Sequence, residues 1–199
     1  MSLTIRQGFA PEDRARAVRL YWQAFGGKLG RVLQPEARAL AYVARVMRPD
    51  HAISAYGAGG ALLGLVGFKT AKGAFVGGGF SDLAAIWGRS GAFWRAALLV
   101  LLERDTEDQR FLMDGIFVDA DARGQGVGTA LLDAVCAEAV ARGYGEIRLD
   151  VIDSNDRARA LYERNGFRAV STSRTGALRH VVGFASATTM VRRLAPEGA

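Results

Sequence analysis

The apolar and polar residues of the chain follow periods that are typical of alternating strands and helices. In the middle of the chain, the run Leu112–Val118 is apolar on both faces, as in a strand that is covered from two sides. Beyond it, apolar residues recur at helical spacing, at Val127, Leu131 and Val135, while charged residues fall elsewhere on the helix. We therefore predict a strand, a turn and an amphipathic helix in this region.

The N-terminal quarter predicts one strand and two helices. Leu3 opens an edge or second strand. Pro11 suits the first turn of a helix, and we expect the pair Gly26-Gly27 to end that helix. A second helix starts at Pro35 and ends by Pro49.

The remaining strands are predicted from period-two patterns and turn residues. Two strand-like runs, 51–56 and 62–70, surround a glycine-rich turn and predict a hairpin. Residues 146–152 alternate apolar and charged side chains and predict another strand. A helix then ends at Gly166, and two final strands cover residues 167–172 and 181–192.

Residues 71–108 form a helical insert between the third and fourth predicted strands. Its glycine-rich start favours a flexible entrance loop, with a second anion site as the alternative, and Ser81-Asp82 is the expected helix cap. Helical segments are expected near residues 83–87 and 92–103. The second segment is apolar nearly all round, so it must be covered either by the chain's own core, which we favour, or by a homodimer contact; its large apolar residues are Phe93, Trp94, Leu98, Leu99 and Leu102.

Size and composition predict one domain over residues 1–199. Half of the 199 residues are hydrophobic and 23% are charged, and no linker divides the chain. The longest apolar run is far shorter than the roughly twenty residues that a membrane span needs. The N-terminus has no signal-peptide pattern, so we expect a cytoplasmic protein.

Several classes of site are disfavoured by the residue inventory. The single cysteine, Cys136, cannot form an intrachain disulfide and is expected to be a small buried hydrophobe. His51 and His180 have no neighbours at ligand spacing, so we expect no metal. The net charge is +6, but the arginines are scattered without a basic run, which argues against nucleic acid. A polyanionic cofactor explains part of the positive charge.

The turn between the central strand and helix has the sequence Arg123-Gly-Gln-Gly-Val-Gly128. Glycines at alternate positions leave backbone N–H groups uncovered, and the following helix adds its own free N–H groups and the positive end of its dipole. Phosphate is the natural ligand for such a loop. The spacing differs from the dinucleotide pattern, and no Lys-Ser or Lys-Thr follows as in NTPase loops.

This region resembles the GNAT superfamily of acyl-CoA-dependent N-acyltransferases. The pyrophosphate loop of that family has the form Arg/Gln-x-x-Gly-x-Gly/Ala, which Arg123, Gly126 and Gly128 match. Downstream, Asn155, Tyr162 seven residues later, and then Gly166-Phe167 are similar to the second family signature. The resemblance is close over residues 111–170, the expected cofactor-binding core. It implies an α/β (α+β) GNAT fold: a mixed, mostly antiparallel sheet of six to seven strands flanked by helices.

The resemblance also implies a site that holds acetyl-CoA as co-substrate. The fourth and fifth strands are expected to splay apart, so that pantetheine pairs with the exposed strand edge and an N–H of Phe117 or Val118 polarises the thioester carbonyl. The residues expected to contact the cofactor are Ile116, Phe117, Val118, Arg123, Gly124, Gln125, Gly126, Val127, Gly128, Thr129 and Asn155.

Two residues are candidates for proton transfer. Tyr162 and Asn155 project from one side of a short helix. The sequence alone favours a core aromatic and a helix cap, whereas the resemblance makes Tyr162 the general acid and Asn155 a pantetheine contact. Asp114 is the one charged residue in an apolar strand. It is either the general base, acting through water, or an acceptor of backbone hydrogen bonds at a bulge made by Gly115.

The leading hypothesis is therefore an enzyme that transfers the acetyl group of acetyl-CoA to a primary amine, of a small molecule, by direct attack. The alternatives are a protein or peptide N-acetyltransferase and a CoA-binding regulatory module without turnover. An open groove would favour a peptide acceptor, whereas closure by residues 73–104 would favour a small molecule.

Overall fold

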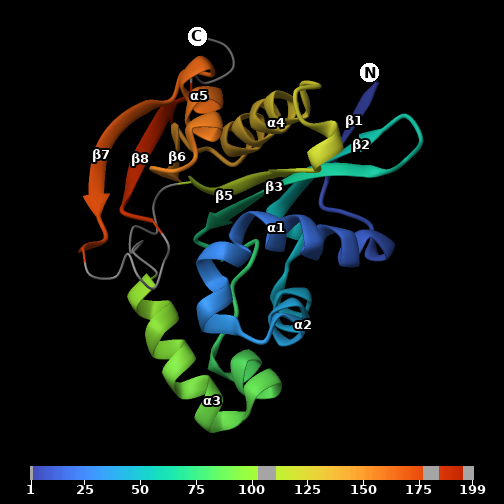
Figure 1. Ribbon diagram of the computed structural model, residues 1–199. Coiled ribbons are helices and arrows are strands. Elements are labelled where there is room, and N and C mark those ends of the chain that lie inside the picture. The colour runs from blue at the N-terminus through green and yellow to red at the C-terminus, as the bar shows by residue number, and fades with distance from the viewer. Residues whose placement is uncertain (1, 103–110, 177–183, 195–199) are drawn as a thin grey trace.

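The computed structural model describes residues 2–102, 111–176 and 184–194, and is built around one twisted sheet (Figure 1). The strand order is β1-β2-β3-β5-β6-β8-β7, with the two-residue β4 paired to β3. Every pair is antiparallel except β5–β6. The strands are β1 (Leu3–Gln7), β2 (Ala52–Gly57), β3 (Leu62–Thr70), β4 (Gly73–Ala74), β5 (Phe111–Val118), β6 (Glu146–Ile152), β7 (Arg168–Arg174) and β8 (Ser186–Arg193). The predicted mixed, mostly antiparallel sheet is confirmed.

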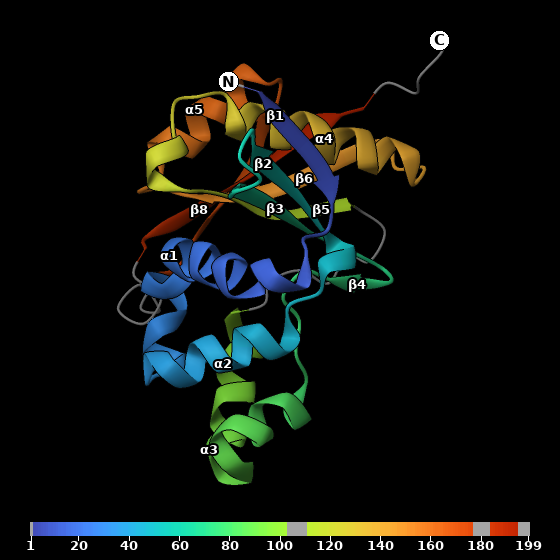
Figure 2. The same cartoon turned by 90° about the vertical axis from the view of Figure 1, so that its right-hand side faces the viewer.

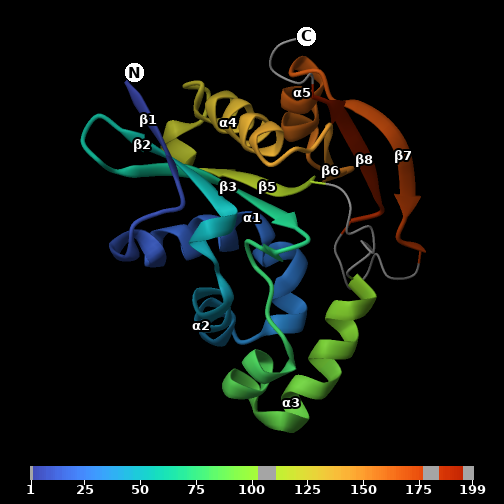
Figure 3. The same cartoon turned by 180° about the vertical axis from the view of Figure 1, so that it is seen from behind.

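Helices cover both faces of this sheet (Figures 2 and 3). One face carries α4 (Val127–Ala141) and α5 (Asp156–Arg164). The other carries α1 (Arg14–Leu33), with α2 (Glu36–Val46) and α3 (Phe80–Leu102) stacked beyond it. Short 3₁₀ turns, η1 (Pro11–Asp13), η2 (Pro49–His51) and η3 (Ala120–Ala122), complete the connections. The core accordingly divides into one apolar cluster on the α1 side and another on the α4 side.

The first helix is longer than the sequence predicts. It continues through Gly26-Gly27 to Leu33, and its later part turns away from the sheet toward α2 (Figure 2). Each glycine costs a helix about 1 kcal/mol. Val32 and Leu33 are each only 1% exposed, and burying two such side chains contributes about 1.5–3 kcal/mol each. Burial of the last turn therefore outweighs the glycines, and the predicted stop is wrong.

The two helical segments of the insert are confirmed as two parts of α3. They meet at Gly88, whose backbone is non-helical with φ 73° and ψ 168°. The predicted cap is shifted, because Asp82 lies inside the first turn, where it accepts a hydrogen bond from the Gly79 N–H at 3.1 Å. Phe93 is 72% exposed and Trp94 is 46% exposed, whereas Leu98 and Leu99 pack against the α1-side cluster. Only part of the apolar surface is thus covered by this chain, the side chain of Leu102 lies outside the described residues, and the homodimer stays a prediction.

The glycine-rich start of the insert is packed only in part, because residues 77–79 are exposed, and the flexible entrance loop stays a prediction. Phe75 is fully buried, and a Cβ atom at Gly67 would stand 2.3 Å from its ring. A Cβ at Gly78 would stand 2.5 Å from the Tyr42 hydroxyl. These glycines therefore serve close packing of the segment against β3 and α2.

The C-terminal elements follow the prediction where the structure describes them. The turn after α5 has Gly166 at φ +80°, the left-handed conformation expected after a helix end. β8 starts at Ser186; residues 181–183 of the predicted last strand lie outside the described residues. Cys136 is buried, as predicted. Among the described helices, none is long and apolar enough to cross a membrane.

Candidate functional site

The sheet opens between β5 and β6. These parallel strands pair only at their first residues, from Phe111↔Ile147 to Met113↔Leu149. Beyond this point β6 continues paired with β8 as far as Ile152, and β5 continues paired with β3 as far as Val118. The second half of β5 therefore has a paired edge toward β3 and a separate edge toward the opening.

The register of β5 shows which backbone groups line that opening. The Asp119 N–H donates to Leu63 O at 2.8 Å, and the Phe117 carbonyl oxygen would stand 2.7 Å from a Cβ at Gly64. Both observations place the polar groups of Phe117 on the β3 side. Because backbone groups alternate along a strand, those of Ile116 and Val118 face the opening. The register thus favours Val118 over Phe117 as the oxyanion donor.

The loop after β5 has the conformation that an anion site requires. Gly124 and Gly126 have φ of +79° and +82°, and a Cβ at either position would meet no atom within 4 Å. Gly126 is also the N-cap residue of α4. In the part of the chain that the structure describes, no hydrogen bond uses an N–H of residues 124–129 as donor. These N–H groups and the positive end of α4 fit a diphosphate.

Side chains brace this loop. The Gln125 amide nitrogen donates to the Asp121 carbonyl at 2.7 Å, and the Asp119 carboxylate accepts from the Asp121 N–H at 3.1 Å. The Arg123 Nε donates to the Val118 carbonyl at 3.1 Å, which confirms that this carbonyl faces away from β3. Arg123 itself is exposed, so its positive charge lies at the mouth of the opening.

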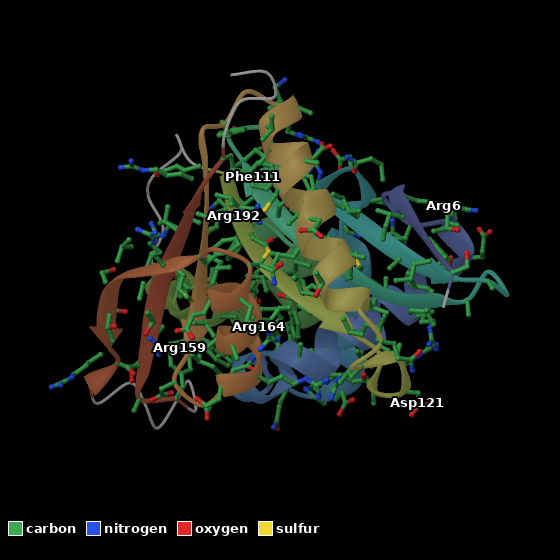
Figure 4. The ribbon with its side chains drawn as sticks, turned by 90° about the horizontal axis from the view of Figure 1, so that it is seen from above. Arg6, Phe111, Asp121, Arg159, Arg164 and Arg192 are labelled. Atoms are coloured by element: carbon green, nitrogen blue, oxygen red, sulfur yellow. The ribbon has the colours of Figure 1, made fainter. Side chains whose placement is uncertain are left out.

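The helix α5 lies beside the start of α4. A Cβ at Gly128 would stand 3.3 Å from Leu161 Cδ2, so the missing side chain allows this contact. Figure 4 shows α5, with Arg159 and Arg164, next to α4. At the start of α5, the Asn155 side chain accepts a hydrogen bond from the Ala158 N–H at 3.2 Å. Asn155 is therefore a helix cap, and its role as a pantetheine contact stays a prediction.

Tyr162 lies on the same helix, packed into the α4-side cluster. It is 6% exposed, and its ring centroid lies 5.8 Å from that of Phe167. Burial raises the pKa of its hydroxyl from 10.0 to about 12. None of the hydrogen bonds between described residues involves this hydroxyl, which leaves it able to donate to a bound group. The ring is therefore a core aromatic, and the role of its hydroxyl as general acid stays a prediction.

Asp114 lies at a bulge in β5. Gly115 pairs with Gly67 and Met113 with Phe68, so Asp114 is an extra residue in the ladder. Burial raises the pKa of Tyr21 on α1, and the negative charge of the Asp114 carboxylate is the second largest cause of this rise. This places Asp114 toward α1, whereas Tyr162 belongs to the α4-side cluster. The two candidates thus belong to opposite faces of the sheet.

An aromatic cluster adjoins Asp114 on the α1 face. Tyr21 and Phe25 come from α1, Phe117 from β5 and Phe75 from the segment after β4. The ring of Tyr21 has its centroid 4.9 Å from that of Phe25, 6.0 Å from that of Phe75 and 5.4 Å from that of Phe117. Sequence reasoning missed Phe75; the signal was Gly67, an interior strand glycine of the kind that marks a close approach.

Among the described residues, no group of three or more His, Cys, Asp or Glu side chains could hold a metal ion.

Comparison with known proteins places these features in context. A model of a family described as acetyltransferase (GNAT) family matches residues 18–167. Over 54 residues the chain is 46% identical to mycothiol acetyltransferase of Beutenbergia cavernae, a match that covers 27% of this chain and only 18% of that protein.

Solved structures share the fold across the whole chain. A Corynebacterium glutamicum protein described as histone acetyltransferase HPA2 and related acetyltransferase superposes with a TM-score of 0.67 at 19% identity, covering 100% of both chains. A GCN5-related N-acetyltransferase from Kribbella flavida superposes with a TM-score of 0.60 at 19% identity, covering 96% of this chain and 98% of the other.

Proposed function

Because the chain belongs to the GNAT family of acetyltransferases, we propose that it transfers the acetyl group of acetyl-CoA to the primary amine of a small molecule. The observation that carries this proposal is the β5–β6 opening directly followed by the glycine loop. One end of the site suits an anion, and the other presents a strand edge and two proton-transfer groups.

The loop and the strand edge would hold the co-substrate. The N–H groups of residues 124–129 bind the diphosphate, and each charge-assisted hydrogen bond contributes about 1.5–3 kcal/mol. The free edge of β5 at Ile116 and Val118 pairs with the amide groups of the pantetheine arm in the manner of an added strand. When bound, acetyl-CoA supplies an activated acyl group. Arg123 must release the Val118 carbonyl for this edge to pair along its full length.

The Val118 N–H acts on the thioester carbonyl. It is a fixed donor at the opening, and a preorganised donor stabilises the negative charge that develops on that oxygen. The amine nitrogen then forms a bond to the carbonyl carbon while the carbon–sulfur bond breaks.

Asp114 and Tyr162 move the protons of this step. An alkylammonium has a pKa near 10, so it must lose a proton before it can attack. Asp114, one methylene shorter than a glutamate, accepts that proton through a water molecule. The amine nitrogen loses a second proton to solvent as the amide forms, while Tyr162 donates its proton to the departing thiolate and is reprotonated from solvent. The products are therefore an amide, a free thiol and one released proton.

A small acceptor is favoured by the packing of the insert. Phe75, from the segment after β4, lies within the aromatic cluster beside Asp114 and is fully buried. The same segment packs on α2, where a Cβ at Gly78 would meet the Tyr42 hydroxyl. This packing supports a small acceptor over an extended peptide. The name of the partial relative, mycothiol acetyltransferase, gives the same class of reaction.

The test combines binding with turnover. Calorimetry with CoA and with acetyl-CoA measures cofactor binding, and release of free thiol in the presence of a panel of amines measures transfer, with the acetylated product identified by mass spectrometry. We expect binding, amine-dependent thiol release and an N-acetyl product. Binding without turnover on any amine or peptide would instead support a regulatory CoA-binding module, and acetylation of peptides alone would support a protein acetyltransferase.

A further inference from the structure

The aromatic cluster and Asp114 together carry information about the acceptor. Besides its contacts with Tyr21, the ring of Phe117 lies with its centroid 5.6 Å from that of Phe25 and 6.1 Å from that of Phe75. A Cβ at Gly115 would stand 3.2 Å from the Phe117 ring and 3.5 Å from the Phe25 ring. The residue next to Asp114 therefore lies directly against these rings.

Exposure shows where this cluster can be reached. Tyr21, Phe75 and Phe117 are buried, at 7%, 0% and 3% exposed. Phe25 and Asp114, in contrast, are half-buried. A ligand that approaches the carboxylate of Asp114 from the α1 side would thus meet the Phe25 ring, with the other rings behind it.

The charges of the surrounding helices restrict the ligand further. Two arginines of α1 and α2 are paired with acids: Arg16 with Asp119 and Arg45 with Asp82, each at 2.9 Å. The remaining charges on these helices are still mostly basic. Among the residues of α1 and α2 whose side chains are described, the basic ones are Arg14, Arg16, Arg19, Arg38 and Arg45, against the single acid Glu36.

This excess of positive charge on the two helices disfavours the approach of a molecule with several positive charges. One carboxylate, Asp114, suffices for one ammonium group, and the half-buried ring of Phe25 suits an apolar or aromatic body, with cation–π attraction to the ammonium as a further contribution.

We propose, on the basis of the acetyl transfer proposed above, that the acceptor is a monoamine with an aromatic or bulky apolar body. Its ammonium binds beside Asp114, its body contacts Phe25 and the neighbouring rings, and polyamines are poor acceptors. Phe25 is a specificity-determining residue in this arrangement, and Asp114 serves both binding and proton removal.

The experiment compares three amines as acceptors, 2-phenylethylamine, butylamine and spermidine, at a saturating concentration of acetyl-CoA. We expect kcat/KM for 2-phenylethylamine to exceed that for each of the others by at least about tenfold, because apolar groups that fit a pocket discriminate by about 10-fold to 200-fold. Calorimetry of 2-phenylethylamine added to the CoA-loaded protein gives a second readout that does not depend on turnover.

Variants test whether the rings set this preference. Phe25→Ala should reduce the ratio of kcat/KM for 2-phenylethylamine to kcat/KM for butylamine by about fivefold, while the KM for acetyl-CoA stays unchanged. Phe25→Tyr should retain the preference. Phe93→Ala is the matched control, because it removes an aromatic ring that is 72% exposed on α3 and should change neither value.

The outcomes separate this inference from the proposed function. Equal or better use of spermidine or butylamine, an unchanged ratio in Phe25→Ala, or CoA binding with no acetylation of any of the three amines would each overturn the monoamine assignment while leaving the family activity in place. Absence of CoA and acetyl-CoA binding by the folded protein would overturn the proposed function, and this inference with it.

Discussion

At the scale of single residues, the proposed mechanism depends on a protonated Tyr162. Burial raises its pKa to about 12, so the phenol stays protonated throughout the neutral range. A general acid must hold its proton until the thiolate leaves, and a buried phenol does so without a partner that competes for the hydrogen bond.

Replacement of Tyr162 by phenylalanine tests this role. We expect kcat to fall by about 10-fold to 100-fold, with acetyl-CoA binding intact, because the proton donor is lost and the ring is kept. The melting temperature should change little, since the hydroxyl makes no hydrogen bond among the described residues. Steady-state kinetics and calorimetry check both expectations, and unchanged turnover would remove Tyr162 from the acid role.

The same pKa predicts how stability depends on alkaline pH. The folded pKa lies above the unfolded value of 10.0, so the folded protein binds more protons between about pH 10 and about pH 12. The stabilisation is fully present below pH 10 and is lost as pH rises through the folded pKa; it amounts to at most about 3 kcal/mol. Urea unfolding at a series of pH values should show a shallower decline in Tyr162→Phe than in the unchanged protein. Parallel declines would mean that Tyr162 does not titrate as described.

Several site residues could be predicted from the sequence because their backbone role is local. Gly124 and Gly126 are glycines that the loop conformation requires, and Asn155 precedes a helix that it caps. Phe75 could not be predicted to join the site, because its position depends on contacts with residues far away in the chain. The same holds for Asp114: the sequence shows a charge in an apolar strand, but only pairing with β3 reveals the bulge.

At the scale of elements, we expect the glycine loop and the start of α4 to bind the diphosphate together. The test is Gly126→Leu with Gly143→Leu as matched control, because Gly143 has the same φ, +82°, and equally open surroundings at the other end of α4. Both variants should lose about 1–2 kcal/mol of stability from the left-handed backbone. Only Gly126→Leu should weaken CoA binding, by about 10-fold to 100-fold if one hydrogen bond of about 1.5–3 kcal/mol is lost. Normal CoA affinity in Gly126→Leu would contradict the assignment of the loop.

Packing of the insert on the sheet predicts a second element-scale effect. In Gly67→Ala the new Cβ would stand 2.3 Å from the Phe75 ring, so the ring or the strand must shift, at a cost of about 1–3 kcal/mol. Gly59→Ala in the β2–β3 turn is the control, because its Cβ would meet nothing within 4 Å. Urea unfolding should show a lower free energy of unfolding for Gly67→Ala but not for Gly59→Ala. The double variant Gly67→Ala with Phe75→Leu should recover part of that free energy. Equal stability of both single variants would contradict the close contact.

Elements with their own periodicity were predictable, whereas those stabilised by distant contacts were not. β5, α4 and β6 follow the expected spans because pattern, turn and cap residues agree. The first helix continues beyond Gly26-Gly27 because Val32 and Leu33 are buried against other elements. Local helix propensity gives no information about such contacts.

At the scale of the whole molecule, the net charge of +6 should assist the capture of a polyanionic co-substrate. We expect kcat/KM for acetyl-CoA to fall several-fold when NaCl rises from about 50 mM to about 500 mM, because the screening length shortens severalfold over this range. Acetyl-pantetheine is the control, since it lacks the phosphates and should show little salt dependence. An equal decline of kcat/KM for both substrates would show that salt affects the protein itself and not the electrostatic attraction of the phosphates.

The contact between Gly128 and Leu161 joins the two working parts of the site mechanically. With no side chain at position 128, the start of α4 packs closely against Leu161 of α5, the helix that carries Tyr162. A larger residue at position 128 would therefore push the two helices apart, and a chimera that exchanges α5 alone would have to keep a side chain no larger than leucine at position 161.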